Sequence, residues 1–322
     1  MKAIVYREYG STDVLRYEDI EKPVPSAEEV LIRVHAASVN PLDAHLMHGV
    51  PAFLRPLVGM KKEKVHRPGV DVAGEVESVG ASVTHFKPGD AVFGSCKGAF
   101  AEYGCASETK LVRKPENITY EQAASAPVAA YTALQGLRDK AHLQSGQRLL
   151  VNGAAGGVGT FTVQIGKWLG AEVTAVCSTR NADMVRSIGA DRVIDYTREN
   201  FTKTGQRYDV IFDLVANHSL TACRRVLAPN GTYVGAGVLG LSKLAIPVRL
   251  MAAPVLSRFG TKKFFMLLAK FNDQDLATIR DLMANGKVRP VIERCYKLTE
   301  AADAIRHLQT GHARGKIIIK VI

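Results

Sequence analysis

The glycine-rich segment VNGAAGGVG, residues 151–159, constrains the fold of this chain more than any other stretch. It lies between an apolar run, RLLV, and a segment with helical periodicity, VGTFTVQIGKWLG. In this context Gly153 permits a tight turn, Gly156 lets the backbone approach a pyrophosphate, and Gly159 lets the helix pack close to the strand. The helix N-terminus would bind the phosphates; a glycine-rich turn without a ligand is the alternative.

The surrounding sequence predicts two domains. Up to about residue 119, short β-branched runs are separated by turn signals such as FKPGDAVFG, which is typical of an antiparallel barrel-like domain. Residues 121–137 read as a helix, and strands then alternate with helices, which indicates a parallel sheet covered on both faces. We therefore predict an α/β fold with a barrel-like domain (1–122), a doubly wound domain (123–270) and a C-terminal segment (271–322) whose final strand returns to the first domain.

The end of the strand after the glycine turn indicates which dinucleotide binds. NAD-binding proteins usually carry Asp or Glu there, against the ribose hydroxyls. This chain has Ser178, Thr179 and Arg180, and its next acid is Asp183. A carboxylate would repel a 2′-phosphate, whereas hydroxyls and a guanidinium can bond it. The sequence therefore predicts NADPH as the cofactor, with Arg180 as an ordinary surface residue as the alternative.

Charge and cysteine content restrict the partners and the compartment. The net charge is +11, but the basic residues are spread along the chain without interleaved stacking aromatics, so we do not expect nucleic acid as a main partner. The five cysteines occur singly, which favours neither a disulfide framework nor a thiolate zinc site. The N-terminus lacks a secretory pattern, and no window is apolar for long enough to span a bilayer. We expect a reducing compartment and predict a cytoplasmic location.

Several motifs, in order along nearly the whole chain, carry a family resemblance. They are MKAIVYREYG, ASVNPLDAHLMHG, PGVDVAGEVESVG, FKPGDAVFG, GAAGGVGTFTVQIGKWLGA, GADRVIDY and GHARGKIII. The chain resembles the medium-chain dehydrogenase/reductase superfamily, and within it the quinone oxidoreductase branch, which includes plant alkenal/enone oxidoreductases and the mitochondrial reticulon-interacting oxidoreductase. The resemblance implies a GroES-like barrel domain, a Rossmann domain and a homodimer.

The same resemblance identifies the positions at which zinc-dependent members bind their catalytic metal. Those members use a cysteine and a Gly-His-Glu motif, where this chain has Asn40 and the residues Gly69, Val70 and Asp71. An amide and a valine do not supply the nitrogen, thiolate or carboxylate ligands that zinc requires, so we predict no metal. Without a Lewis acid, hydride delivery to an electron-poor acceptor is easier than alcohol oxidation.

Catalytic residues are harder to assign. The Asn-x-x-Asp motif of the family matches Asn40 and Asp43, which the resemblance places beneath the nicotinamide, although a turn-stabilising Asn-Pro pair is an equally good interpretation. The tyrosine that donates a proton in related enoyl reductases has no counterpart in MHGVPAF. His45, His48 or water are the remaining candidates for that role.

The resemblance also implies further cofactor contacts. Thr132 matches a threonine near the nicotinamide, and Tyr196 matches a tyrosine beside the adenosine phosphate, with strand packing as the alternative. The remaining matches are Ala155, Gly157 and Val158 in the pyrophosphate loop, and His312, Ala313 and Arg314 in a C-terminal loop that closes over the cofactor.

One segment is basic and free of acids. Between Asp213 and Asp273 there is no Asp or Glu, and residues 238–270 mix apolar and cationic side chains as an interfacial helix would. The cations of the acid-free stretch are Arg224, Arg225, Lys243, Arg249, Arg258, Lys262, Lys263 and Lys270. We expect a lid, a buried segment or an oligomer interface, and peripheral contact with anionic membrane is the alternative.

These observations lead to one principal hypothesis and two alternatives. The principal hypothesis is a zinc-independent, NADPH-dependent oxidoreductase that transfers hydride to a small hydrophobic quinone or an α,β-unsaturated carbonyl compound. A zinc-free NADP-dependent alcohol dehydrogenase or carbonyl reductase is the first alternative. The second is a nucleotide-sensing or RNA-binding protein with little turnover.

Overall fold

The structure is a computed structural model that describes residues 1–49, 65–237 and 245–322. Contacts divide these residues into two compact units. Unit 1 comprises Met1–Val128, Phe271–Ala284 and Ile292–Ile322, and unit 2 comprises Ala129–Lys270 and Asn285–Val291. The sequence predicts boundaries after residues 122 and 270, whereas the contacts place the first boundary at Val128 and assign Asn285–Val291 to unit 2.

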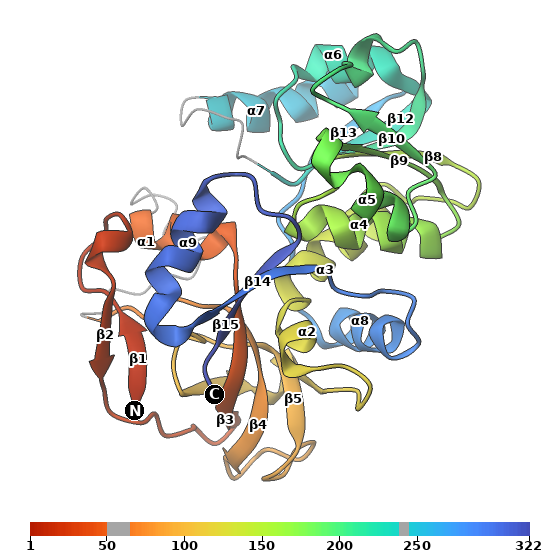
Figure 1. Cartoon of the computed structure of the whole chain (residues 1–322). Coiled ribbons are helices and arrows are strands. Elements are labelled where there is room, and N and C mark those ends of the chain that lie inside the picture. Colours follow the sequence, from red (N-terminus) through yellow and green to blue (C-terminus); the bar gives the residue numbers. More distant parts are fainter. Residues whose placement is uncertain (50–64, 238–244) are drawn as a thin grey trace. The chain divides into compact units, whose positions relative to one another are not determined.

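Unit 2 is built on a six-stranded parallel sheet in the order β10-β9-β8-β11-β12-β13. Helices α4 and α5 lie on one face of it and α6 and α7 on the other (Figure 1). The strands are β8 (Arg148–Asn152), β9 (Glu172–Cys177), β10 (Arg192–Asp195), β11 (Tyr208–Asp213), β12 (Leu227–Gly235) and β13 (Lys263–Met266). The helices are α3 (Pro127–Gln135), which begins at the end of unit 1, α4 (Gly157–Trp168), α5 (Ala182–Ser187), α6 (Leu220–Val226) and α7 (Ala245–Arg258). This arrangement confirms the predicted doubly wound fold.

The central strands of unit 2 have mainly apolar interiors on both faces because helices cover both faces of the sheet. Leu149, Leu150 and Val151 of β8 are fully buried, as are most residues of β11. The helix predicted over residues 121–137 is divided into α2 (Tyr120–Ala124) and α3. Pro127 begins the second helix, because proline lacks the amide needed in a helix interior but suits a first helical position.

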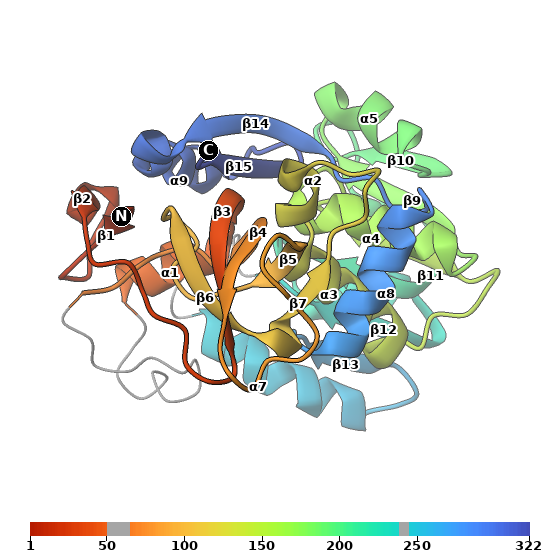
Figure 2. The same cartoon turned by 90° about the horizontal axis from the view of Figure 1, so that it is seen from below.

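Unit 1 contains the antiparallel domain (Figure 2), whose main sheet has the order β14-β15-β3-β4-β5-β7 with β6 also paired to β3. The C-terminal strand β15 runs antiparallel to β3 and parallel to β14. The strands are β1 (Lys2–Val5), β2 (Arg16–Asp19), β3 (Glu29–Val39), β4 (Asp71–Val79), β5 (Ala91–Ser95), β6 (Tyr103–Ser107), β7 (Leu111–Arg113), β14 (Ile292–Lys297) and β15 (Lys316–Lys320). The remaining helices are α1 (Pro41–His48), α8 (Asp273–Ala284) and α9 (Ala301–Gln309).

The acid-free segment is integrated into unit 2. Residues 238–244, including Lys243, lie outside the described residues; the helices and strands formed by the rest are α6, β12, α7 and the edge strand β13. Arg249, predicted as one of the interfacial cations, is instead only 7% exposed, because it pairs with the carboxylate of Asp213. The apolar side chains of Met251, Val255 and Phe259, spaced four residues apart, are 75%, 53% and 64% exposed. None of the described helices has both the length and the apolar character needed to cross a membrane.

Candidate active site

The glycine turn connects β8 to α4 in unit 2. Gly153 has φ +90, in the region that side chains disfavour, and a Cβ there would lie 2.8 Å from Cγ2 of Val215. A Cβ on Gly159 would lie 2.1 Å from the carbonyl oxygen of Gly153, so only glycine allows the helix to approach the turn this closely. The amides of Gly153 and Ala154 both donate to the carbonyl of Val176, which fixes the turn against β9.

Gly156 differs from these two glycines because the protein leaves open space beside it. A Cβ at this position would meet nothing closer than 3.5 Å, so packing within the protein does not require glycine. Gly156 is also the N-cap of α4, and no side chain caps the helix. The amides of the first turn therefore lack intrahelical partners and remain suited to bind an anion. Ala155, Gly157 and Val158 lie in the same turn, so this part of the structure fits a pyrophosphate.

The residues predicted to select the nucleotide follow β9. Ser178 is half-buried, and Thr179 and Arg180 are exposed at the start of a short 3-10 helix. The Thr179 hydroxyl donates to the carboxylate of Asp195, the last residue of the neighbouring strand β10. This acid was not considered in the sequence analysis because it belongs to another strand. Hydrogen bonds, chiefly from Thr179, hold the pKa of Asp195 below its usual range.

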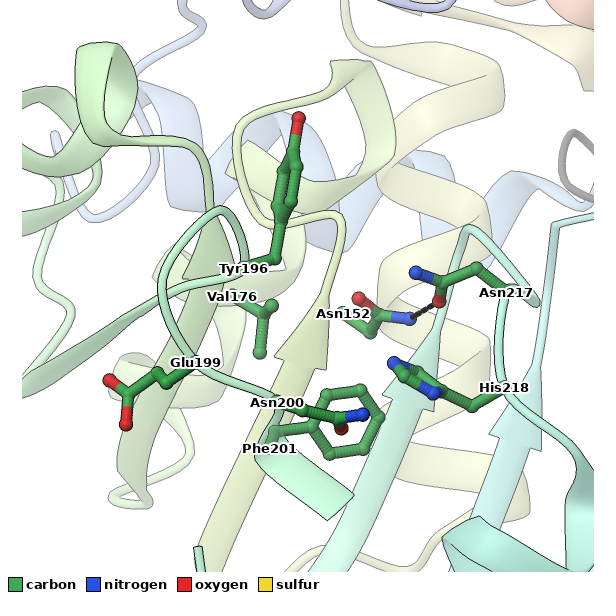
Figure 3. A pocket seen from close by; sticks show the side chains of 8 residues that line it. All are labelled: Asn152, Val176, Tyr196, Glu199, Asn200, Phe201, Asn217 and His218. Atoms are coloured by element: carbon green, nitrogen blue, oxygen red, sulfur yellow. Dashed lines mark hydrogen bonds between the residues drawn. The ribbon is translucent and has the colours of Figure 1, made fainter. Parts of the chain in front are cut away.

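A pocket opens at the carboxyl ends of the strands in unit 2, where doubly wound sheets bind their ligands (Figure 3). Tyr196, predicted as a cofactor contact, lines it and is 54% exposed. Asn152 donates through Nδ2 to Oδ1 of Asn217 at 3.0 Å. His218 packs edge-on against Phe201 with ring centroids 4.7 Å apart. The other lining residues are Val176, Glu199 and Asn200. The sequence analysis missed Asn152, Asn217 and His218, although each follows or ends a predicted strand.

The remaining predicted cofactor contacts are divided between the units. Thr132 is half-buried on α3 in unit 2. Residues 312–314 belong to unit 1, where His312 and Arg314 are exposed and Ala313 is partly buried. The amide of Arg314 donates to the Glu293 carboxylate at 2.9 Å, which ties this loop to β14.

Unit 1 contains a buried polar cluster around Asn40. The ammonium group of Lys316 donates to Oδ1 of Asn40 at 2.7 Å, and Nδ2 of Asn40 donates to Oδ2 of Asp71 at 2.9 Å. Asp71 also accepts from Ser38 Oγ at 2.8 Å and from the amide of Val128 at 3.0 Å. Lys316 Nζ is 3.6 Å from the Asp71 carboxylate, and both side chains are almost completely buried. The two ends of the Asn40 amide are therefore fixed by opposite charges.

Burial and ion pairing have opposite effects on the pKa values of Asp71 and Lys316. Desolvation raises the pKa of Asp71, while Lys316 and the hydrogen bonds from Asn40 and Ser38 lower it. Desolvation likewise lowers the pKa of Lys316, while Asp71 and Asp43 raise it. The sequence analysis did not identify Lys316; a lone lysine before three isoleucines is its only signal.

Asp43 is a backbone-binding residue in this structure. Its Oδ2 accepts from the amide of Asn40 at 2.8 Å, and its Oδ1 accepts from the amide of Gly69 at 3.2 Å. The carboxyl group therefore caps α1 and holds the loop before β4. Desolvation, with a smaller contribution from Asp71, raises the pKa of Asp43 to about 7, although these amides and Lys316 oppose the shift.

The two histidines of α1 lie outside the buried cluster. His45 is exposed, although desolvation and, to a smaller extent, His48 lower its pKa. The ring of His48 is 2.8 Å from Nε2 of Gln309. The structure thus places Asn40 in the polar cluster. Asp43 instead accepts hydrogen bonds from backbone amides, and His45 lies outside the cluster.

The positions corresponding to metal ligands offer an unsuitable donor set. Asn40 and Asp71 are hydrogen-bonded to each other, Val70 has an alkyl side chain, and the Lys316 ammonium lies among the polar groups. Three nitrogen, thiolate or carboxylate ligands are the ordinary requirement for zinc. Among residues 1–49, 65–237 and 245–322, no group of three or more histidine, cysteine or acidic side chains could hold a metal ion.

Comparison with known proteins agrees with this architecture. Residues 26–116 match the alcohol dehydrogenase GroES-like domain, and residues 188–319 match the zinc-binding dehydrogenase domain. The chain is 34% identical to the mitochondrial NAD(P)H oxidoreductase RTN4IP1 of Mus musculus, covering 100% of this chain and 89% of the relative. It is also 34% identical to the chloroplastic NADPH-dependent alkenal/one oxidoreductase of Arabidopsis thaliana, covering 99% and 79%.

A solved structure, the quinone oxidoreductase from Coxiella burnetii, superimposes with a TM-score of 0.87 at 32% identity, covering 100% of this chain and 99% of that one. The chain thus belongs to the medium-chain dehydrogenase/reductase superfamily, whose GroES-like and parallel-sheet domains it contains. Within that superfamily it falls in the quinone oxidoreductase branch and is an oxidoreductase.

Proposed function

We propose that this protein is a zinc-independent, NADPH-dependent reductase of electron-poor acceptors, either quinones or α,β-unsaturated aldehydes and ketones. The buried Asn40–Asp71–Lys316 cluster is the observation that carries the proposal. Because it offers an amide, one carboxylate and an ammonium, it favours a reaction that needs no Lewis acid. The names of the relatives support the same acceptor classes.

NADPH would supply a hydride when bound, and the chain's own residues would hold its phosphates. The uncapped N-terminus of α4 and the open space beside Gly156 suit the pyrophosphate. Arg180 and Ser178 suit a 2′-phosphate. Asp195 lies nearby, but its carboxylate accepts from the Thr179 hydroxyl and from the amide and hydroxyl of Thr197, with Arg198 3.6 Å away. These contacts reduce its repulsion of a phosphate.

The test is oxidation of NADPH, with NADH in parallel, by chelator-treated protein whose zinc content has been measured. Turnover of alkenals, enones or quinones with NADPH and no metal is the expected result. Alcohol-dependent reduction of NADP⁺ that requires added zinc would overturn the proposal in favour of an alcohol dehydrogenase. Tight NADPH binding without turnover of any acceptor would instead favour a sensing or RNA-binding role.

We also propose that the protein forms a homodimer through the outer edge of unit 2. β13 is the edge strand of the six-stranded sheet, and its outer backbone groups can pair with a second copy. The exposed apolar side chains of Met251 and Val255 on α7, and of Phe259 just after the helix, would be covered in the same contact. Light scattering after gel filtration should give a dimer mass, and Phe259→Asp should give a monomer. A wild-type monomer that sediments with phosphatidylserine vesicles at low salt would support membrane contact instead.

A further inference from the structure

Arg249, one of the cations of the acid-free segment, is buried and bonded through both of its terminal nitrogens, while its Nε has no hydrogen-bond partner among the described residues. It lies on α7, yet its guanidinium reaches the carboxyl end of β11. One terminal nitrogen donates to the carbonyls of His218 at 2.9 Å and Ala216 at 3.3 Å. The other donates to Oδ2 of Asp213 at 3.1 Å and to the hydroxyl of Tyr233. A surface cation would not be bound by four acceptors in this way.

The contacts of Arg249 converge on a strained turn. Ala216 has φ +62, a left-handed conformation that is costly for any residue with a Cβ. Oδ1 of Asp213 accepts from the amides of Val215 at 3.1 Å and Ala216 at 2.9 Å. Asp213 therefore holds the amides of the turn and Arg249 holds its carbonyls. The conformation depends on both charged side chains.

This turn carries two side chains of the pocket in Figure 3. Asn217 accepts from Asn152, the last residue of β8, and His218 packs against Phe201. Asn152 also donates to Oδ1 of Asp213 at 2.8 Å, so the pocket wall and the charged pair form one hydrogen-bonded network. In a doubly wound sheet the phosphates lie at the helix after β8 and the ribose lies at the end of the next strand, so this pocket faces the adenosine half of a dinucleotide.

We propose that Arg249 is a positioning residue for cofactor binding: it holds the Ala216–His218 turn in the shape in which Asn217 and His218 complete the adenosine pocket. The proposal rests on the NADPH binding proposed above. It makes the affinity for the adenosine half depend on the docking of α7, a helix that follows the turn by some 30 residues and none of whose described side chains lines the pocket. We place only the adenosine half of the cofactor against this network, so the hydride-transferring end would not depend on it.

The test compares Arg249→Lys with Arg258→Lys, a matched change at an exposed position of the same helix. Lysine keeps the positive charge near Asp213 but cannot span the carboxylate and two carbonyls with a planar fork. Arg249→Lys should raise the Kd of 2′,5′-ADP and the KM of NADPH on the order of tenfold, with kcat at saturating NADPH unchanged. Arg258→Lys should leave all three values at the wild-type level.

Two outcomes would overturn the proposal. One is an unchanged Kd for 2′,5′-ADP in folded Arg249→Lys, and the other is equal loss of kcat and affinity. If the variant does not fold, hydrogen exchange on the wild type decides, because 2′,5′-ADP should protect the amides of Val215 and Ala216 and those around Arg249 together. Protection of the turn without α7 would refute the coupling. Failure of the wild type to bind NADPH or 2′,5′-ADP would instead refute the proposed function.

Discussion

The ammonium group of Lys316 donates a 2.7 Å hydrogen bond to Oδ1 of Asn40 inside unit 1. The bond joins the first residue of the last strand to the N-cap of the first α-helix, 276 positions apart in the chain. It also fixes which end of the Asn40 side chain faces Asp71, since an ammonium can only donate. The oxygen and nitrogen of the Asn40 amide could otherwise exchange places by a rotation of the side chain. These contacts therefore select one of the two orientations.

Removing the ammonium group of Lys316 should destabilise the folded protein. Lys316→Met leaves the Asp71 carboxylate buried without its cation, so we expect the free energy of unfolding to fall by about 3–5 kcal/mol. Urea denaturation would measure the change. Lys320→Met on the same strand removes an exposed lysine paired with Glu121 at 2.8 Å, and should lower the free energy of unfolding far less, because solvent screens this pair. Similar losses in the two variants would show that the buried pair has no special role.

The raised pKa of Asp43, about 7, gives the fold a pH dependence. The folded protein retains this proton where the unfolded chain has released it, so the contribution is present below about pH 4 and is lost as the pH rises to about 7. The loss is on the order of 4 kcal/mol. Unfolding of wild type and Asp43→Asn should therefore be compared between pH 4 and 7, because the shifts of groups that do not interact with Asp43 cancel in the difference.

Asp43→Asn should abolish that decline with pH, even though one backbone amide loses its acceptor and the variant is less stable overall. Asp183→Asn, at a fully exposed side chain, is the control and should preserve the wild-type pH profile. A constant difference between Asp43→Asn and wild type over this range would mean that Asp43 is ionised throughout.

Two glycines of the phosphate turn should respond differently to alanine. Gly159→Ala places a Cβ 2.1 Å from the Gly153 carbonyl, so we expect a loss of about 2–3 kcal/mol in stability. Gly156→Ala meets no atom closer than 3.5 Å and should cost less than about 1 kcal/mol, but its methyl group enters the space left for phosphate. Thermal unfolding and NADPH titration separate the two effects. Normal NADPH affinity in Gly156→Ala would place the pyrophosphate elsewhere.

Arg180 should determine the preference for NADPH over NADH. Arg180→Met removes a guanidinium suited to a 2′-phosphate, so the ratio of kcat/KM for NADPH to that for NADH should fall about tenfold or more. Arg186→Met, on the neighbouring helix α5, removes an exposed arginine paired with Asp183 and should leave the ratio unchanged. An unchanged ratio in Arg180→Met would make Arg180 an ordinary surface residue.

Much of unit 2 could be predicted because its signals are local. Gly153 and Gly159 follow from the strand–turn–helix context, and the structure gives each a steric reason. The polar networks were not predictable in the same way. Lys316 looks like a solvent-facing residue at the start of a strand, and Asp195 lies in a strand that the search for a ribose-binding acid did not include. Their roles depend on which strands become neighbours.

The role of Arg249 could not be predicted from local sequence either. In the sequence it is one cation among eight in an acid-free stretch, and this composition suggests an exposed basic surface. Its partner, Asp213, is the acid at which that stretch begins, 36 residues earlier. The helix that carries Arg249 folds back over the sheet, which brings the two together. Composition within a window cannot detect a pair whose members lie 36 residues apart in the chain.

The pairing of β15 with β3 has a consequence for biosynthesis. Strand β15 is translated after every strand of the unit 2 sheet, so the barrel sheet cannot be complete until residue 320 has been made. The parallel sheet of unit 2 needs only residues 148–266, which emerge from the ribosome earlier. Unit 1 therefore begins to be made before unit 2 but completes its sheet after it, and β3 keeps an exposed edge in the nascent chain until β15 has been made.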